Sequence, residues 1–91
     1  MGETGYLLDN QAVQAGSRFD ALSALFDPGT FRHIAALGIA PGWRCWEVGA
    51  GGPSVARWLA QRVGPQGQVL ATDLDISWAR QAAAPGIEVR R

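Results

Sequence analysis

The sequence predicts an α/β fold in which helices precede a small parallel sheet of about three strands. Three observations support this prediction. An apolar segment, 43–48, runs directly into the glycine-rich turn 49–52. A segment with helical spacing of apolar residues, 53–63, follows the turn, and a second apolar segment, 68–72, comes directly after it. Strand, helix and strand of these lengths form a βαβ unit with parallel strands.

Composition limits the classes of function. The 91 residues form one small domain at most. Eight basic and eight acidic residues cancel, so we expect neither a nucleic-acid-binding surface nor a membrane-attracting patch. The single cysteine, Cys45, excludes an intrachain disulfide framework, and in a central strand it is expected to be a small buried apolar residue. No apolar run approaches the roughly 18 residues of a membrane span, and no secretion signal is visible, so a cytoplasmic location is expected.

The N-terminal segment 1–42 is predicted to be helical after an irregular start at residues 1–10. Apolar residues recur at spacings of three and four from Asn10 to Phe26, although Gly16 weakens this helix near its middle. Asp27 and Pro28 suit the cap and first position of a second helix, which Gly38 would end. His33 has no second ligand at metal spacing, so a surface or packing role is expected for it.

The segment 43–91 begins with the strand and the glycine-rich turn, where a ligand site is expected. Glycine tolerates positive φ and has no Cβ, so the backbone of Gly49 and Gly51 can approach a ligand closely. The N-terminus of the next helix then favours an anionic or polar group beside the turn. Glu47 lies in an apolar strand two residues before the first glycine, where a carboxylate is costly unless it has a partner. These residues favour a nucleotide-type site over a bare strand-to-helix connection.

A second acidic residue follows the second strand. Asp73 lies 24 residues after Gly49, near the offset of about 20 at which a carboxylate meets a ribose hydroxyl in βαβ nucleotide sites. Asp75 or Ser77 could cap a short helix over 76–83, and capping is the favoured role for Asp75. A third strand is expected at 87–90, with the first strand in the centre of the sheet.

Two stretches of this chain resemble a known family. Glu47-Val48-Gly49-Ala50-Gly51-Gly52 and Ala71-Thr72-Asp73-Leu74-Asp75 are similar to the first two motifs of class I S-adenosylmethionine-dependent methyltransferases. The family pattern is an acidic residue, an apolar residue and G-x-G-x-G; here Pro53 replaces the third glycine, and Gly52 would compensate by a shift of one residue. The similarity covers about residues 43–78.

The resemblance implies a Rossmann-like domain that binds S-adenosylmethionine. It places backbone of the turn against the amino-acid and ribose parts of the cofactor, Glu47 at the amino-acid end, and Asp73 on the ribose hydroxyls. Trp78 could lie against the adenine, but ordinary packing is the favoured role. The cofactor-binding residues implied are Glu47, Gly49, Ala50, Gly51, Gly52 and Asp73. No catalytic residue and no metal site is indicated, and the methyl acceptor is unknown.

Two alternatives remain from the sequence. A dinucleotide-binding oxidoreductase fragment would use G-x-G-x-x-G, but Ser54 stands at the third position and Glu47 is unexpected there. A non-catalytic module completed by a partner chain is supported by the small sheet. The full family uses about seven strands, so we expect this chain to be its cofactor-binding N-terminal part, a truncated gene product or a fragment. Such a sheet would leave an apolar face and strand edges uncovered, with possible self-association.

Overall fold

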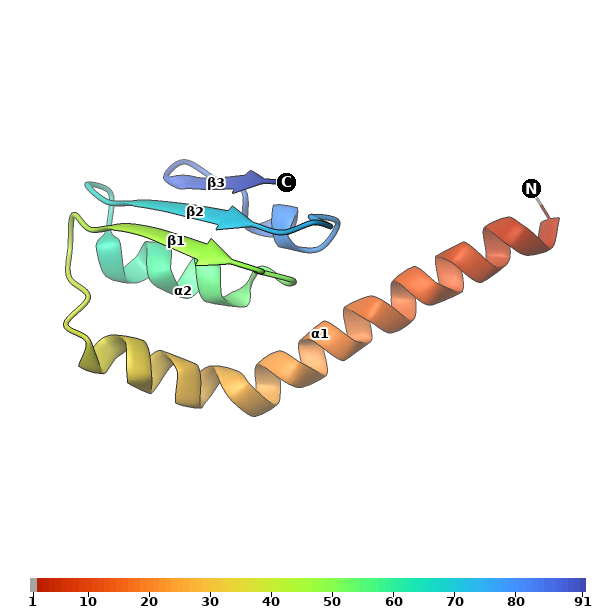
Figure 1. The fold of residues 1–91 in the computed structure, drawn as a ribbon, viewed down its shortest axis with the longest axis horizontal. Helices are drawn as coiled ribbons and strands as arrows, with labels where there is room; N and C mark the ends of the chain where they lie inside the picture. Colours follow the sequence, from red (N-terminus) through yellow and green to blue (C-terminus); the bar gives the residue numbers. More distant parts are fainter. Residues whose placement is uncertain (1) are drawn as a thin grey trace.

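The computed structural model describes the backbone of residues 2–91 and the side chains of residues 14–91. One long helix is followed by three strands, with a helix in the first connection and a short 3-10 helix in the second (Figure 1). In chain order the elements are α1 (Gly2–Ala36), β1 (Arg44–Val48), α2 (Ser54–Val63), β2 (Gln68–Thr72), η1 (Ala79–Ala82) and β3 (Ile87–Arg90). The chain is therefore an α/β fold of an incomplete Rossmann-like kind, as the sequence predicts.

The three strands are parallel and lie in the order β1-β2-β3. Trp46 of β1 pairs with Leu70 of β2, which pairs in turn with Glu88 of β3. The strand limits and the parallel pairing confirm the sequence prediction. The prediction that the first strand is central is wrong in this sheet. Both connections step in the same direction, so β2 lies between its neighbours and β1 forms an edge.

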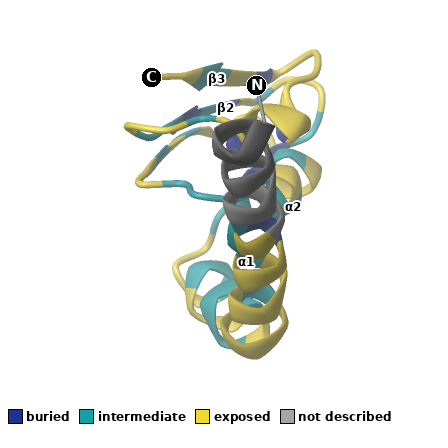
Figure 2. Cartoon of the chain, turned by 90° about the vertical axis from the view of Figure 1, so that its right-hand side faces the viewer, coloured by how far each residue is buried: buried dark blue, intermediate teal, exposed yellow. Residues whose placement is uncertain are grey.

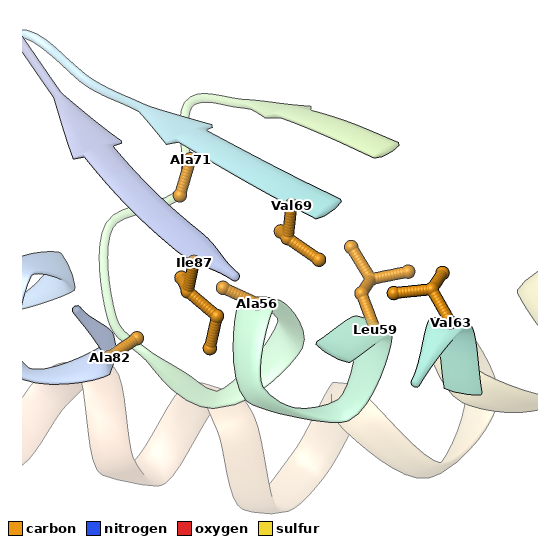
Figure 3. Packing of buried hydrophobic residues seen from close by; sticks show 7 residues of the cluster. All are labelled: Ala56, Leu59, Val63, Val69, Ala71, Ala82 and Ile87. Carbon is orange, nitrogen blue, oxygen red and sulfur yellow. The ribbon is translucent and has the colours of Figure 1, made fainter. Parts of the chain in front are cut away.

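Helix α2 covers one face of the sheet. Side chains from β2 and β3 point toward α2 in Figure 3, and the buried positions are coloured dark blue along the chain in Figure 2. This happens because α2 carries apolar residues at helical spacing and the strands alternate sides, so one set from each element meets. The cluster comprises Ala56, Leu59, Val63, Val69, Ala71, Ala82 and Ile87.

The opposite face of the sheet is uncovered in the described structure. Trp46 and Val48, which alternate with the half-buried residues of β1, are 67% and 72% exposed. The expectation of an uncovered apolar face is confirmed.

Helix α1 differs from the prediction. It is continuous from Gly2 to Ala36 with Pro28 inside it, so the irregular start is not found from Gly2 onward, and there is no break at Asp27. A proline clashes with the carbonyl four residues earlier, here Ala24, and α1 is visibly bent partway along its length (Figure 1). The chain accommodates Pro28 by this bend instead of ending the helix.

Contacts with α2 hold the C-terminal part of α1 against the body. The rings of Phe31 and Trp58 stack with centroids 4.7 Å apart, and the guanidinium of Arg62 lies over Trp58. After α1 ends, Gly38 takes a φ of 87° and donates its N–H to Ala35 O at 3.0 Å. The helix stop predicted at Gly38 is confirmed.

The helix predicted over 76–83 is only the 3-10 helix η1. Asp75 accepts hydrogen bonds from the N–H and the hydroxyl of Ser77. These bonds form a local turn, so residues 75–77 are not helical. The prediction that Asp75 or Ser77 caps a helix here is wrong, because the N-cap of η1 is Trp78, which makes no side-chain capping bond, and Asp75 bonds only within its own turn. Among the described residues, no helix combines the length and the apolar character needed to cross a membrane.

Candidate functional site

The glycine-rich turn lies at the carboxyl end of β1, beside the carboxyl end of β2. Gly49 and Ala50 both donate their N–H groups to Thr72 O, at 2.8 and 3.0 Å. These bonds extend the β1–β2 pairing into the turn, and Gly49 and Gly51 then adopt φ values of 73° and 65°. Glycine is required at both positions because other residues rarely adopt this conformation. In open α/β sheets, ligands bind at this edge.

Asp73 is joined directly to the turn. Its Oδ2 accepts the Gly51 N–H at 2.8 Å, and its Oδ1 accepts the Asp75 N–H at 3.2 Å. The Gly51 bond, followed by the Asp75 bond, lowers the pKa of Asp73 below its ordinary value, so the carboxylate is ionised at neutral pH. The structure thus brings together the two parts of the site that the sequence separates by more than twenty residues.

Glu47 is half-buried below the turn. Its Oε1 is shielded from solvent and has no hydrogen-bond partner among the side chains and backbone that the structure describes. Burial, and then the nearby charges of Asp27 and Asp73, raise the pKa of Glu47 to about 7. A cation placed at this carboxylate would remove both costs, so the arrangement favours a positively charged group.

A hollow of about 380 Å³ lies between α1 and the glycine turn. Its volume falls within the range of small-molecule sites. The part of α1 that faces it is mostly apolar, and Leu22 and Phe26 keep 46% and 59% of their surface exposed there. The lining residues are Phe19, Leu22, Ser23, Phe26, Asp27, Gly49, Ala50, Gly51, Gly52, Ser54 and Val55.

A second hollow of about 360 Å³ lies at the ends of the strands and contains Asp73. Gly49 lines both hollows, and a Cβ placed on it would meet no described atom within 4 Å. Gly51 is different, because Phe19 Cε1 would lie 3.0 Å from its Cβ. The open approach to the turn is therefore at Gly49, while Phe19 covers the turn at Gly51.

Two contributors to the site come from α1 and were missed by the sequence analysis. Asp27 was interpreted as a helix cap because it precedes Pro28, yet it lies in the continuous helix and lines the first hollow. Phe19 is one of the apolar residues that recur at helical spacing between Asn10 and Phe26. Its spacing gives no sign that it meets a glycine turn more than thirty residues later.

Other residues singled out from the sequence take structural roles. The indole of Trp78 packs against Gly16 of α1, in line with the favoured packing role. Burial raises the pKa of the Cys45 thiol, which is the reverse of what an activated nucleophile needs. His33 is exposed. Among the side chains at 14–91, no three metal-ligating residues are grouped.

The fold and this edge of the sheet define an α/β chain of incomplete Rossmann-like kind, with a glycine turn tied to an aspartate. A scan against protein-family models finds no match to the chain. Searches of curated proteins and of solved structures likewise find no match.

Proposed function

We propose that this chain binds S-adenosylmethionine and is the cofactor-binding part of a methyltransferase. The observation that carries the proposal is the half-buried, unpartnered Oε1 of Glu47 beside a glycine turn that Asp73 holds through the Gly51 N–H. A ligand with an ammonium group and a ribose fits these features. The carboxylate of Glu47 lacks a cation, the backbone at the glycine turn can be approached closely, and the second carboxylate, Asp73, can accept ribose hydroxyls.

The residues present fit the cofactor. Glu47 would accept hydrogen bonds from the amino-acid ammonium, and the backbone at Gly49 would approach the ligand without steric hindrance. Asp73 accepts hydrogen bonds from two backbone N–H groups, but a carboxylate has about four acceptor positions, which leaves room for ribose hydroxyls. Ala50, Gly51 and Gly52 would shape the turn. When bound, the cofactor supplies an activated methyl group on a sulfonium, and the protein contributes position and electrostatics.

The methyl acceptor and the catalytic residues are not assigned. The hollow under α1 combines the apolar residues Leu22 and Phe26 with the carboxylate of Asp27. A cytoplasmic location, expected from the sequence, stays a prediction.

Calorimetric titration of the chain with S-adenosylmethionine, S-adenosylhomocysteine and NAD tests the proposal. We expect binding of the first two and none of NAD. Glu47→Gln should weaken both more than Asp20→Asn, a matched change at an exposed carboxylate of α1. Binding of NAD alone would favour the dinucleotide-binding alternative and refute the proposal.

One observation favours a second candidate, a non-catalytic module that a partner chain completes. The bare sheet face carries Trp46 and Val48, both more than 60% exposed, and β1 has a free edge in the described sheet. Failure of all three ligands in the titration would favour this candidate.

A further inference from the structure

Helix α1 is anchored by a contact that involves none of the proposed ligand-binding residues. Gly16 is buried, and the indole of Trp78 occupies the space where a side chain would stand. A Cβ on Gly16 would clash with Trp78 Cη2 and would lie 2.7 Å from Cζ2 and 2.9 Å from Cζ3. Cβ atoms do not approach other atoms so closely in proteins, so only glycine admits the ring at this position.

This contact connects the two segments that form the candidate site. Trp78 follows the loop that begins at Asp73, whereas Gly16 lies one helical turn before Phe19. Phe19 covers Gly51, and the next turn of α1 places Ser23 Oγ 3.2 Å from Ser54 Oγ, at the start of α2. The packing of Trp78 against Gly16 therefore also positions Phe19 against the turn, and with it the side of the first hollow that α1 forms.

Among the described residues, the other interactions of this part of α1 include one hydrogen bond and two apolar side chains that stay largely exposed. The Ser23–Ser54 hydrogen bond is a single neutral pair, and Leu22 and Phe26 remain about half exposed. The indole of Trp78 adds a large aromatic contact to these interactions, at the position of Gly16. Filling the space at Gly16 where the Trp78 ring lies should therefore release α1 from the turn, while the Phe31–Trp58 stack stays in place.

We propose that the Gly16–Trp78 contact is a latch that closes α1 over the glycine turn, and that Gly16 and Trp78 are positioning residues for the ligand. A ligand held by both the turn and α1 binds more tightly when α1 is closed, and by reciprocity it makes α1 open less often. The coupling to ligand rests on the proposed function, whereas the closure of α1 by the latch does not.

Hydrogen exchange over residues 14–30, with and without S-adenosylhomocysteine, tests the latch in the full chain. Gly16→Ala should raise exchange and weaken S-adenosylhomocysteine binding by about fivefold or more, the size that overpacking produces. Alanine also raises helix propensity, so faster exchange cannot come from a weaker helix. Ser17→Ala, an exposed neighbour, is the matched control and should change neither quantity.

A second variant keeps the test specific. Trp78→Phe replaces the indole by a smaller ring that lacks the three atoms that would clash with a Cβ at position 16. The double variant Gly16→Ala/Trp78→Phe should therefore regain part of the exchange protection that Gly16→Ala loses. Exchange in Gly16→Ala equal to that in Ser17→Ala would overturn the latch. Faster exchange with unchanged ligand affinity would overturn the coupling. If the unmodified chain binds no S-adenosylhomocysteine, the proposed function and the coupling fail, and exchange alone decides the latch.

Discussion

Replacing Glu47 with glutamine should make the chain more stable at pH 8. The half-buried carboxyl has its pKa raised from 4.5 to about 7, by burial first and by Asp27 and Asp73 second. The folded state therefore binds a proton that the unfolded state has already released between these pH values. The free energy of unfolding should consequently fall as pH rises from about 4.5 to 7 and then level off.

The size of the effect follows from the same shift. If the whole pKa shift of Glu47 counted, the free energy of unfolding would change by about 3 kcal/mol. Because Glu47 is only half buried, solvent screens the interaction, and we expect about 1–2 kcal/mol. For a domain of this size, that change corresponds to a shift in Tm of roughly 5–15 °C. Glutamine has nearly the shape of the protonated glutamic acid, so it should retain the stability of the acidic state at all these pH values.

Thermal unfolding by circular dichroism at pH 5, 6, 7 and 8 measures the effect. The unmodified chain should lose stability from pH 5 to about 7 and change little above that, whereas Glu47→Gln should show little dependence on pH. Asp20→Asn, at an exposed position, should keep the slope of the unmodified chain. Equal slopes in Glu47→Gln and the unmodified chain would refute the reasoning. Below about pH 4 the slope should reverse, because Asp73 and Asp75 have lowered pKa values and lose their stabilising bonds on protonation.

Three further predictions follow from other contacts. Asp73→Ala should weaken S-adenosylhomocysteine binding by about tenfold to a hundredfold, because it removes both a ligand acceptor and the bond that holds Gly51, whereas Asp75→Ala should change it much less; equal small effects in calorimetry would argue against the role of Asp73. Gly67→Ala should lower stability by about 1–3 kcal/mol, since its Cβ would clash with Val63 and lie 2.7 Å from Trp43 O. Its control, Gly29→Ala in α1, meets only the end of Arg32 and should be neutral or slightly stabilising in the same denaturant titration. The chain should melt at a low temperature or associate, because its core consists largely of alanine and valine; sedimentation that shows a monomer with a cooperative Tm well above about 60 °C would contradict this.

The sequence predicts the strands and the turn well because their signals are local. Residues 68–72 alternate sides and are bounded by turn residues, and Gly49 and Gly51 stand where positive φ is needed. The sequence also places Asp73 at the same edge of the sheet as the turn, because parallel strands bring their carboxyl ends together, but the direct bond from Gly51 to Asp73 is a finding of the structure.

The errors arise where tertiary structure decides. Pro28 is a strong local signal for a helix start, but α1 bends and continues through it. The order of strands depends on the direction of each connection, which residue patterns in β1 and β2 do not specify. Asp27 and Phe19 join the site only because α1 crosses the turn, and no periodicity within α1 indicates what crosses it.

The fluorescence of Trp46 can report on what covers the open face of the sheet. Its indole Nε1 donates a hydrogen bond to Thr72 Oγ1 at 2.9 Å, so the ring extends from β1 toward β2 across that face. Any protein segment or partner chain that covers this face must either pack on the Trp46 ring or displace it. In both cases the ring leaves water for a drier environment or loses its bond to Thr72. The fluorescence of Trp46, isolated by comparison with Trp46→Phe, is therefore a built-in reporter of whatever covers the sheet.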